Sequence, residues 1–239
     1  MVLKPSSSFT VRHPRSKITI LVKQTDWCYK LGQILHALII DYGFSYMTNE
    51  VYISTDIEAN GRSPGHHSML SFASVAFKLD KTIISTFERN LKELSGAKPN
   101  RETMEWWQTQ PKAWKACRQN QADPKEAMTN YLDWIKFLEG TPIFVAAPVS
   151  FDYRFISWYL WEFTGEDPFL NMNAPQAIDI NTYYIALMNT NITQSHRLSM
   201  PRDLFDPDLP HTHRALDDAM EQAMLFCNLV QNNNDRHLT

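Results

Sequence analysis

VYISTDIE, residues 51–58, alternates its side chains between two sides with a period of two. This alternation is typical of a strand and places Asp56 and Glu58 on one face, about 7 Å apart at a rise of about 3.3 Å per residue. Two carboxylates this close repel each other unless a cation lies near, and Mg²⁺ prefers oxygen ligands. The pattern is suited to a metal site, but a DxE taken alone is weak evidence and is more often a pair of surface carboxylates.

The segments after this strand predict a mixed α/β fold. Two apolar runs separated by Asp80 and Lys81 predict a hairpin that extends residues 51–58 to three antiparallel strands. Helical patterns then alternate with two further short strands, an order typical of a sheet with helices packed on it. The predicted elements are strands 69–79, 83–88, 143–147 and 178–180, and helices within 100–139 and over 151–163, 183–188 and 214–230.

The N-terminal residues have a different pattern from the rest of the chain. Residues 1–16 are rich in Ser, Pro and basic side chains without a period, which predicts an irregular start. A short strand over Ile18–Val22 and a helix through Leu31 to a stop at Gly43 are expected next. We therefore expect an N-terminal extension of unknown role over residues 1–47 and one domain over residues 48–239.

Composition excludes several classes of protein. Of 239 residues, 44% are hydrophobic and 21% are charged, which excludes disorder of the whole chain. With 23 basic and 26 acidic side chains, the protein is not polybasic, so any nucleic acid must be held locally, for instance through metal ions. Cys28, Cys117 and Cys227 form no paired motif, and no apolar run reaches the length of a membrane span. We expect a soluble cytoplasmic protein with no membrane partner.

Asp152 opens the predicted aromatic helix over residues 151–163, for which Ser150 is the expected N-cap. An acid in the first turn of a helix complements the helix dipole by about 0.3–1 kcal/mol, and that role alone would explain it. A carboxylate between Phe151 and Phe155 is nevertheless unusual on an apolar helix face unless a cation lies opposite. The residues alone leave both interpretations open.

HRALDDA, residues 213–219, begins the last predicted helix. Either aspartate is a candidate for a functional role, but at about 100° per residue Asp217 falls on the polar side, whereas Asp218 lies nearer the apolar side. Asp218 is therefore the better candidate to face the sheet. His213 titrates near neutral pH and is suited to proton transfer, although a lone histidine is more often structural or solvated.

The acidic and histidine motifs described above are each common alone, but their occurrence together in this order is rare. Asp56, Glu58, Asp152, His213 and Asp218, in the pattern DxE, FDxxF and HxAxxDA, resemble the DEDDh 3′→5′ exonucleases of the ribonuclease-H-like superfamily, especially their bacterial and phage members. The resemblance covers about residues 48–230. It implies an α/β ribonuclease H-like fold, in which a mixed five-stranded sheet of three antiparallel strands plus parallel strands is flanked by helices.

The resemblance also implies chemistry for these residues. It assigns two divalent cations, Mg²⁺ or Mn²⁺, to Asp56, Glu58 and Asp218, with Asp152 binding directly or through water. His213 would be the general base that takes a proton from the attacking water in a two-metal phosphodiester hydrolysis.

Single-stranded DNA or RNA 3′ ends are the expected partners, because unpaired bases stack on aromatic side chains. Trp107 and Phe155 are candidates for such stacking, with core packing as the alternative. Ala59 and Asn60 occupy the positions where many relatives have Thr or Ser at the terminal nucleotide. No residue identifies a 2′-hydroxyl reader, so DNA and RNA both stay open.

Two alternatives keep the same fold. One is a nucleic-acid-binding module with little or no catalysis, which the loss of a carboxylate would signal. The other is a two-metal endonuclease or strand-transfer enzyme. All four carboxylates and His213 are present, and the histidine motif favours the exonuclease.

Overall fold

The structure is a computed structural model that describes residues 7–13, 16–22, 49–171 and 174–237. The chain divides into two units, Met1–Thr48 and Asn49–Thr239.

The first unit contains an antiparallel pair of strands, β1 (Ser7–His13) and β2 (Ser16–Val22), with Thr10 opposite Thr19. The expectation of an irregular start was wrong for Ser7–His13, where β-branched residue types such as Thr10 and Val11 favour a strand. The helix predicted through Leu31 to Gly43 lies outside the described residues.

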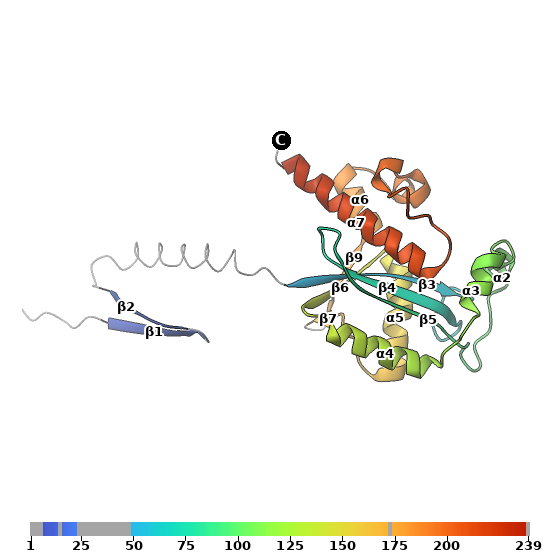
Figure 1. Cartoon of the computed structure of the whole chain (residues 1–239), viewed down its shortest axis with the longest axis horizontal. Helices are drawn as coiled ribbons and strands as arrows, with labels where there is room; N and C mark the ends of the chain where they lie inside the picture. The colour runs from blue at the N-terminus through green and yellow to red at the C-terminus, as the bar shows by residue number, and fades with distance from the viewer. Residues whose placement is uncertain (1–6, 14–15, 23–48, 172–173, 238–239) are drawn as a thin grey trace, which may run out of the picture. The chain divides into compact units, whose positions relative to one another are not determined.

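The second unit is built on a five-stranded sheet in the order β5-β4-β3-β6-β9 (Figure 1). Strands β3 (Glu50–Ala59), β4 (Met69–Phe77) and β5 (Ile83–Asn90) are antiparallel. Strands β6 (Thr141–Ala146) and β9 (Ala177–Asp179) continue the sheet in parallel from β3. The mixed ribonuclease H-like sheet predicted from the sequence is confirmed.

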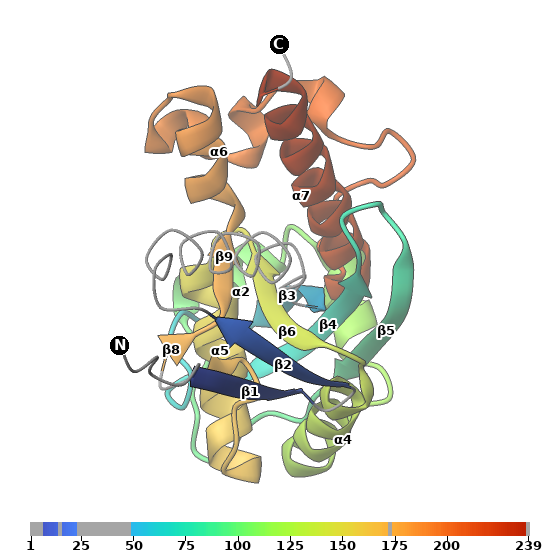
Figure 2. The same cartoon turned by 90° about the vertical axis from the view of Figure 1, so that its left-hand side faces the viewer.

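Helices cover both faces of this sheet (Figures 1 and 2). One face carries α4 and α5, and the other carries α6 and α7. The helices are α2 (Arg101–Trp107), α3 (Pro111–Cys117), α4 (Pro124–Phe137), α5 (Val149–Thr164), α6 (Ile180–Met188) and α7 (Ala215–His237). Short elements complete the unit: the pair β7 (Leu170–Asn171) and β8 (Ala174–Pro175), and the 3-10 turns η1 (Ile192–Ser195), η2 (Arg197–Ser199) and η3 (Arg202–Leu204).

The period of two in β3 separates a core face from a functional face. Val51, Ile53 and Ile57 are buried among the side chains of α4 and α5. Asp56 and Glu58 alternate with them and face α7, and the pairing register with β4 shifts immediately after Glu58. Such irregularities re-aim side chains near the end of a strand. Two carboxylates are thus presented at the end of the central strand.

Asp179 holds the beginnings of two helices. Its Oδ1 accepts a hydrogen bond from Thr182 N of α6 at 2.7 Å, and its Oδ2 accepts one from Val149 N of α5 at 2.8 Å. The prediction that Ser150 is the N-cap was wrong, because α5 begins at Val149. The carboxylate of Asp179 accepts the hydrogen bond of the first amide of the helix. The start of the helix that carries Asp152 is fixed by this contact.

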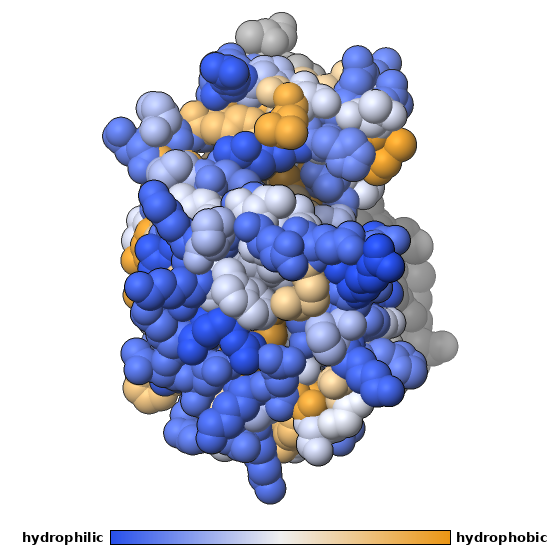
Figure 3. Space-filling view, turned by 90° about the vertical axis from the view of Figure 1, so that its right-hand side faces the viewer, coloured by the Kyte–Doolittle hydropathy of each residue, from blue (hydrophilic) through white to orange (hydrophobic). Residues whose placement is uncertain are grey.

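The surface is mostly hydrophilic on the face that carries α2 and α3, with small apolar patches (Figure 3). The most exposed large apolar side chains among the described residues are Leu198, at 92%, and Phe137, at 90%. None of the described helices combines the length and the apolar character that crossing a bilayer requires.

Candidate active site

Three of the predicted metal ligands meet at one point. One carboxylate oxygen from each of Asp56, Glu58 and Asp218 lies within 4.8 Å of the others. Glu58 and Asp218 are buried, at 8% and 1% exposure, while Asp56 is partly open to solvent. A set of oxygen donors with one open side suits a hard dication such as Mg²⁺.

Asp152 lies beside this acidic cluster (Asp56, Glu58 and Asp218). Its Oδ1 accepts a hydrogen bond from Ile57 N at 3.2 Å, so the buried carboxylate reaches the backbone between the two acidic residues of β3. Its charge acts on both of them. Asp152 is thus brought to the site from the first turn of α5, 95 positions away from Ile57 in the sequence.

Without cations, ionisation of these four clustered carboxyl groups is unfavourable, and their pKa values are raised. Burial raises the pKa of Asp56 and Glu58 well above the ordinary range, and repulsion from neighbouring carboxylates raises both further. Burial also raises the pKa of Asp152 to about 8 and that of Asp218 above its usual value. Cations at this site would neutralise charge that the protein itself leaves uncompensated.

The structure distinguishes Asp218 from its neighbour Asp217. Asp218 accepts hydrogen bonds from Thr212 N at 2.8 Å and His213 N at 3.1 Å, which fix its carboxylate toward β3. Asp217 points instead to Thr212 Oγ1, at 2.7 Å, and to Arg214, at 3.6 Å. The face of the helix inferred from its period therefore agrees with the observed cluster.

His213 precedes α7 with a backbone φ of +57°, a left-handed conformation that is uncommon for a residue with a side chain. Backbone strain of this kind is often found at functional sites. Its ring lies edge-to-face against Trp106, with 5.1 Å between ring centroids. Burial, then the neighbouring His211, lowers the pKa of His213, so its imidazole is neutral at pH 7 and able to accept a proton.

The side chains predicted to contact the substrate are not open to it. Phe155 and Trp107 are buried at 0% and 2% exposure, and the Trp107 indole donates to Ala59 O at 3.0 Å. Asn60 is also buried, with its amide bonded to Glu93 Oε2 and Ser68 N. Phe155 and Trp107 pack in the core, the alternative that the sequence allowed, and substrate contacts by these residues stay a prediction.

Sequence reasoning missed three residues of the site. Gln222 donates to Asp56 Oδ1 at 3.0 Å, and its position one turn after Asp218 on α7 was the available signal. His211 lies beside His213 in an HxH pattern, with 4.6 Å between ring centroids. Trp106, at 38% exposure, is the open member of the tryptophan pair in α2.

His67 and the two described cysteines are not among the residues that form the acidic cluster. His67 Nδ1 lies 3.2 Å from Ser63 N, a local contact in the loop after β3. Cys117 and Cys227 are buried free thiols, whereas Cys28 lies outside the described residues.

Comparison with known proteins agrees with this geometry. Residues 53–226 match the family model RNase_T, described as exonuclease. The chain is 30% identical over 190 residues to the 3′-5′ DNA exonuclease Cap18 of Escherichia coli, an alignment that covers 74% of this chain and 90% of the relative.

Solved structures share the fold at low sequence identity. The nuclease domain of 3′hExo, a DEDDh family member bound to rAMP, superposes with a TM-score of 0.57 at 14% identity, over 78% of this chain and 94% of that one. Exonuclease I of E. coli in complex with a dT13 oligonucleotide gives a TM-score of 0.55 at 13% identity, over 79% and 42% of the two chains. Both similarities concern the fold.

Proposed function

Since the chain belongs to the RNase_T exonuclease family and is a 3′→5′ exonuclease of the DEDDh type, we propose that it hydrolyses single-stranded DNA from the 3′ end with two divalent cations. The observation that carries the proposal is the convergence of Asp56, Glu58 and Asp218, with donor oxygens within 4.8 Å of one another. A preference for DNA is supported by the relative Cap18, which is 30% identical and is a DNA exonuclease.

The donor set fits the cations that such a reaction needs. Asp56, Glu58 and Asp218 offer only oxygen ligands. Their pKa values are raised, so a bound cation would stabilise their ionised forms. We assign cation binding to these three residues, with Asp152 as a fourth ligand, direct or through water. Bound Mg²⁺ or Mn²⁺ would supply an activated water and stabilise the leaving 3′ oxygen.

His213 is proposed as the general base. Its pKa is lowered, so the ring is neutral near pH 7, and one ring nitrogen lies within 4.8 Å of a carboxylate oxygen of Asp218, at the edge of the acidic cluster. A neutral imidazole at this place is suited to take the proton of the attacking water. Trp106 is proposed to hold the terminal base, since it is partly exposed and its ring contacts that of His213.

A time course on 5′-labelled single-stranded DNA and RNA of one sequence, with Mg²⁺, tests the proposal. We expect a ladder that descends from full length, faster on DNA, that EDTA stops and added Mg²⁺ or Mn²⁺ restores. Activity that persists in excess EDTA would contradict a metal mechanism, and equal rates on RNA would contradict the DNA preference.

A circular single-stranded DNA separates exonuclease from endonuclease, because only an endonuclease opens it. Asp56→Ala is the matched inactive protein, expected to fold but not to cut. A nucleic-acid-binding module without catalysis would retain binding of single strands and release no mononucleotide in either protein.

A further inference from the structure

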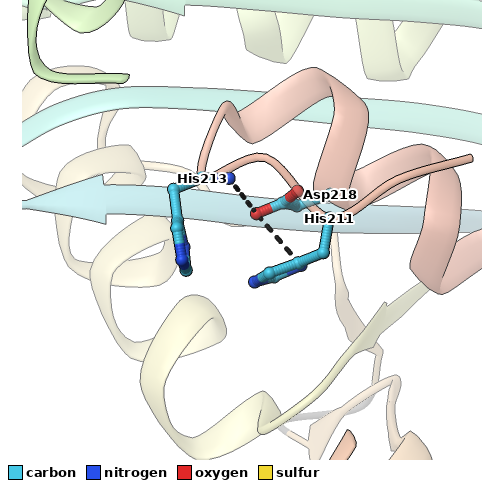
Figure 4. Close-up of side chains that lie close together, drawn as sticks. All are labelled: His211, His213 and Asp218. Atoms are coloured by element: carbon cyan, nitrogen blue, oxygen red, sulfur yellow. Dashed lines mark hydrogen bonds and ion pairs between the residues drawn. The ribbon is translucent and has the colours of Figure 1, made fainter. Parts of the chain in front are cut away.

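A second histidine lies next to the proposed base and is not part of the HxAxxDA motif. The Nδ1 atom of His211 is 3.3 Å from Asp218 Oδ2 and 3.2 Å from Glu221 Oε2. The rings of His211 and His213 project to the same side of the loop before α7, with their planes at 78° (Figure 4). One donor atom from each of His211, His213 and Asp218 lies within 4.8 Å of the others.

The donor types of this histidine cluster (His211, His213 and Asp218) differ from those of the acidic cluster. Two imidazole nitrogens and one carboxylate oxygen form a set that suits Zn²⁺, whereas Mg²⁺ prefers oxygen alone. Zinc bonds of about 2.0–2.1 Å place tetrahedral ligands about 3.4 Å apart. Small rotations of the two rings would therefore close the set around one ion and leave a fourth position open.

The surroundings hold this histidine cluster in place. Asp218 is fixed by the amides of Thr212 and His213. Glu221, which is 3% exposed, contacts His211 and accepts a hydrogen bond from Arg197 Nε at 2.9 Å. With Nδ1 held by Glu221, Nε2 is the ring nitrogen of His211 that is free to bind a metal. A carboxylate bonded to the other ring nitrogen is the usual device that orients a histidine ligand of zinc.

We propose that His211, His213 and Asp218 form a binding site for a transition-metal dication of the Zn²⁺ type. The site shares Asp218 with the acidic cluster and engages the imidazole of His213. If His213 is the base, as proposed above, a bound Zn²⁺ would occupy the lone pair that accepts the proton and so inhibit hydrolysis. The binding site itself does not depend on that role.

Calorimetric titration of the full-length protein with Zn²⁺ in excess Mg²⁺ tests the site directly. Loss of a hydrogen-bond partner of a metal ligand already weakens affinity about 10- to 100-fold, so His211→Ala and His211→Asn should weaken Zn²⁺ binding at least that much. His66→Ala, which removes an exposed histidine after β3, is the control and should bind as wild type. Wild-type affinity in both His211 variants would overturn the proposal.

Co²⁺ provides a readout independent of activity. Visible absorption of bound Co²⁺ reports nitrogen ligation and low coordination number, and we expect the bands in wild type and His66→Ala but not in His211→Ala. Bands unchanged in His211→Ala would show that His211 is not a ligand of the metal and contradict the site.

Inhibition by Zn²⁺ is measured separately, with each protein normalised to its own rate in Mg²⁺ alone. The midpoint of inhibition should rise about tenfold or more in His211→Ala, following the loss of affinity. If the proposed nuclease function fails, no rate exists to inhibit, yet the titration and the Co²⁺ spectrum still decide the metal site.

Discussion

Gln222 connects Asp56 of β3 to the end of β6. Its side-chain Nε2 donates to Asp56 Oδ1 at 3.0 Å, and its Oε1 accepts a hydrogen bond from Ala147 N at 2.9 Å. The amide is 8% exposed, so it holds Asp56 from the buried side and lowers its pKa against the effect of burial. An uncharged donor at this place steadies the proposed metal ligand Asp56 without adding to the negative charge.

Replacement of Gln222 should therefore weaken cation binding while leaving all ligands in place. Gln222→Ala is expected to lose about 10- to 100-fold in Mg²⁺ affinity, the usual effect of removing a partner of a metal ligand. Gln222→Glu should lose more, because it adds a carboxylate to the cluster. Mg²⁺ activation curves measure both, and Gln231→Ala, an exposed position on the same helix, is the control. Unchanged activation by Mg²⁺ in Gln222→Ala would refute the positioning role.

The acidic cluster should destabilise the metal-free protein at neutral pH. The folded-state pKa values of its carboxylates, and that of Asp152, are raised, so the folded protein holds protons that the unfolded chain has lost. Stability from these groups is therefore highest near pH 4 and falls as pH rises toward about 8, the pKa of Asp152. Asp56→Asn removes one charge and should raise the melting temperature of the metal-free protein at pH 8.

Thermal melts with and without Mg²⁺ measure this effect. Binding at about 100 times Kd adds about 2.7 kcal/mol, or about 5–10 °C for a chain of this size. The gain should be larger at pH 8 than at pH 6, because fewer protons must leave, and small in Asp56→Asn. Asp133→Asn, an exposed acid of α4, controls for charge. A Mg²⁺ gain as large in Asp56→Asn as in wild type would count against the cluster as the cation site.

The rate should decline in acid as His213 gains a proton. Burial and His211 lower its pKa, so the base stays neutral until the pH falls below about 6.5, its ordinary value. His213→Gln should lose about 10²–10⁴-fold in kcat. Protonation of the carboxylates also lowers the rate in acid. The pH at which this decline occurs should shift with Mg²⁺ concentration, whereas the pH of the decline caused by His213 should not. A profile that shifts entirely with Mg²⁺ would remove His213 from the role of base.

The sequence was sufficient to predict the sheet because its signals are local. The period of two in β3 sets the faces of Asp56 and Glu58, and the helical angle in α7 separates Asp218 from Asp217. The cap of α5 was not visible, because Asp179 reaches Val149 across 30 positions and no local pattern records that contact.

The sequence also does not show which of two adjacent tryptophans is buried. Trp106 and Trp107 lie about 100° apart on α2, a helix of seven residues that is too short for a period to show which side is buried. Trp107 is buried by contacts with other elements, because it packs with Leu70 and Cys117 and its indole donates to Ala59 O. Phe155 differs, because it lies on a helix of 16 residues in which Phe155, Ile156, Tyr159 and Leu160 have the spacing of one buried face.

Trp106 should act on substrate binding rather than on chemistry. Stacking on an unpaired base is worth about 1–3 kcal/mol, so Trp106→Ala should raise KM by about 5- to 160-fold, while Trp106→Phe should retain most of the affinity. If the ring instead serves to position His213, against which it lies at 5.1 Å, kcat should fall and KM should change little. Steady-state kinetics on a short single-stranded DNA separates the two roles. Trp161→Ala removes a tryptophan that is 50% exposed on α5 and should leave both constants unchanged.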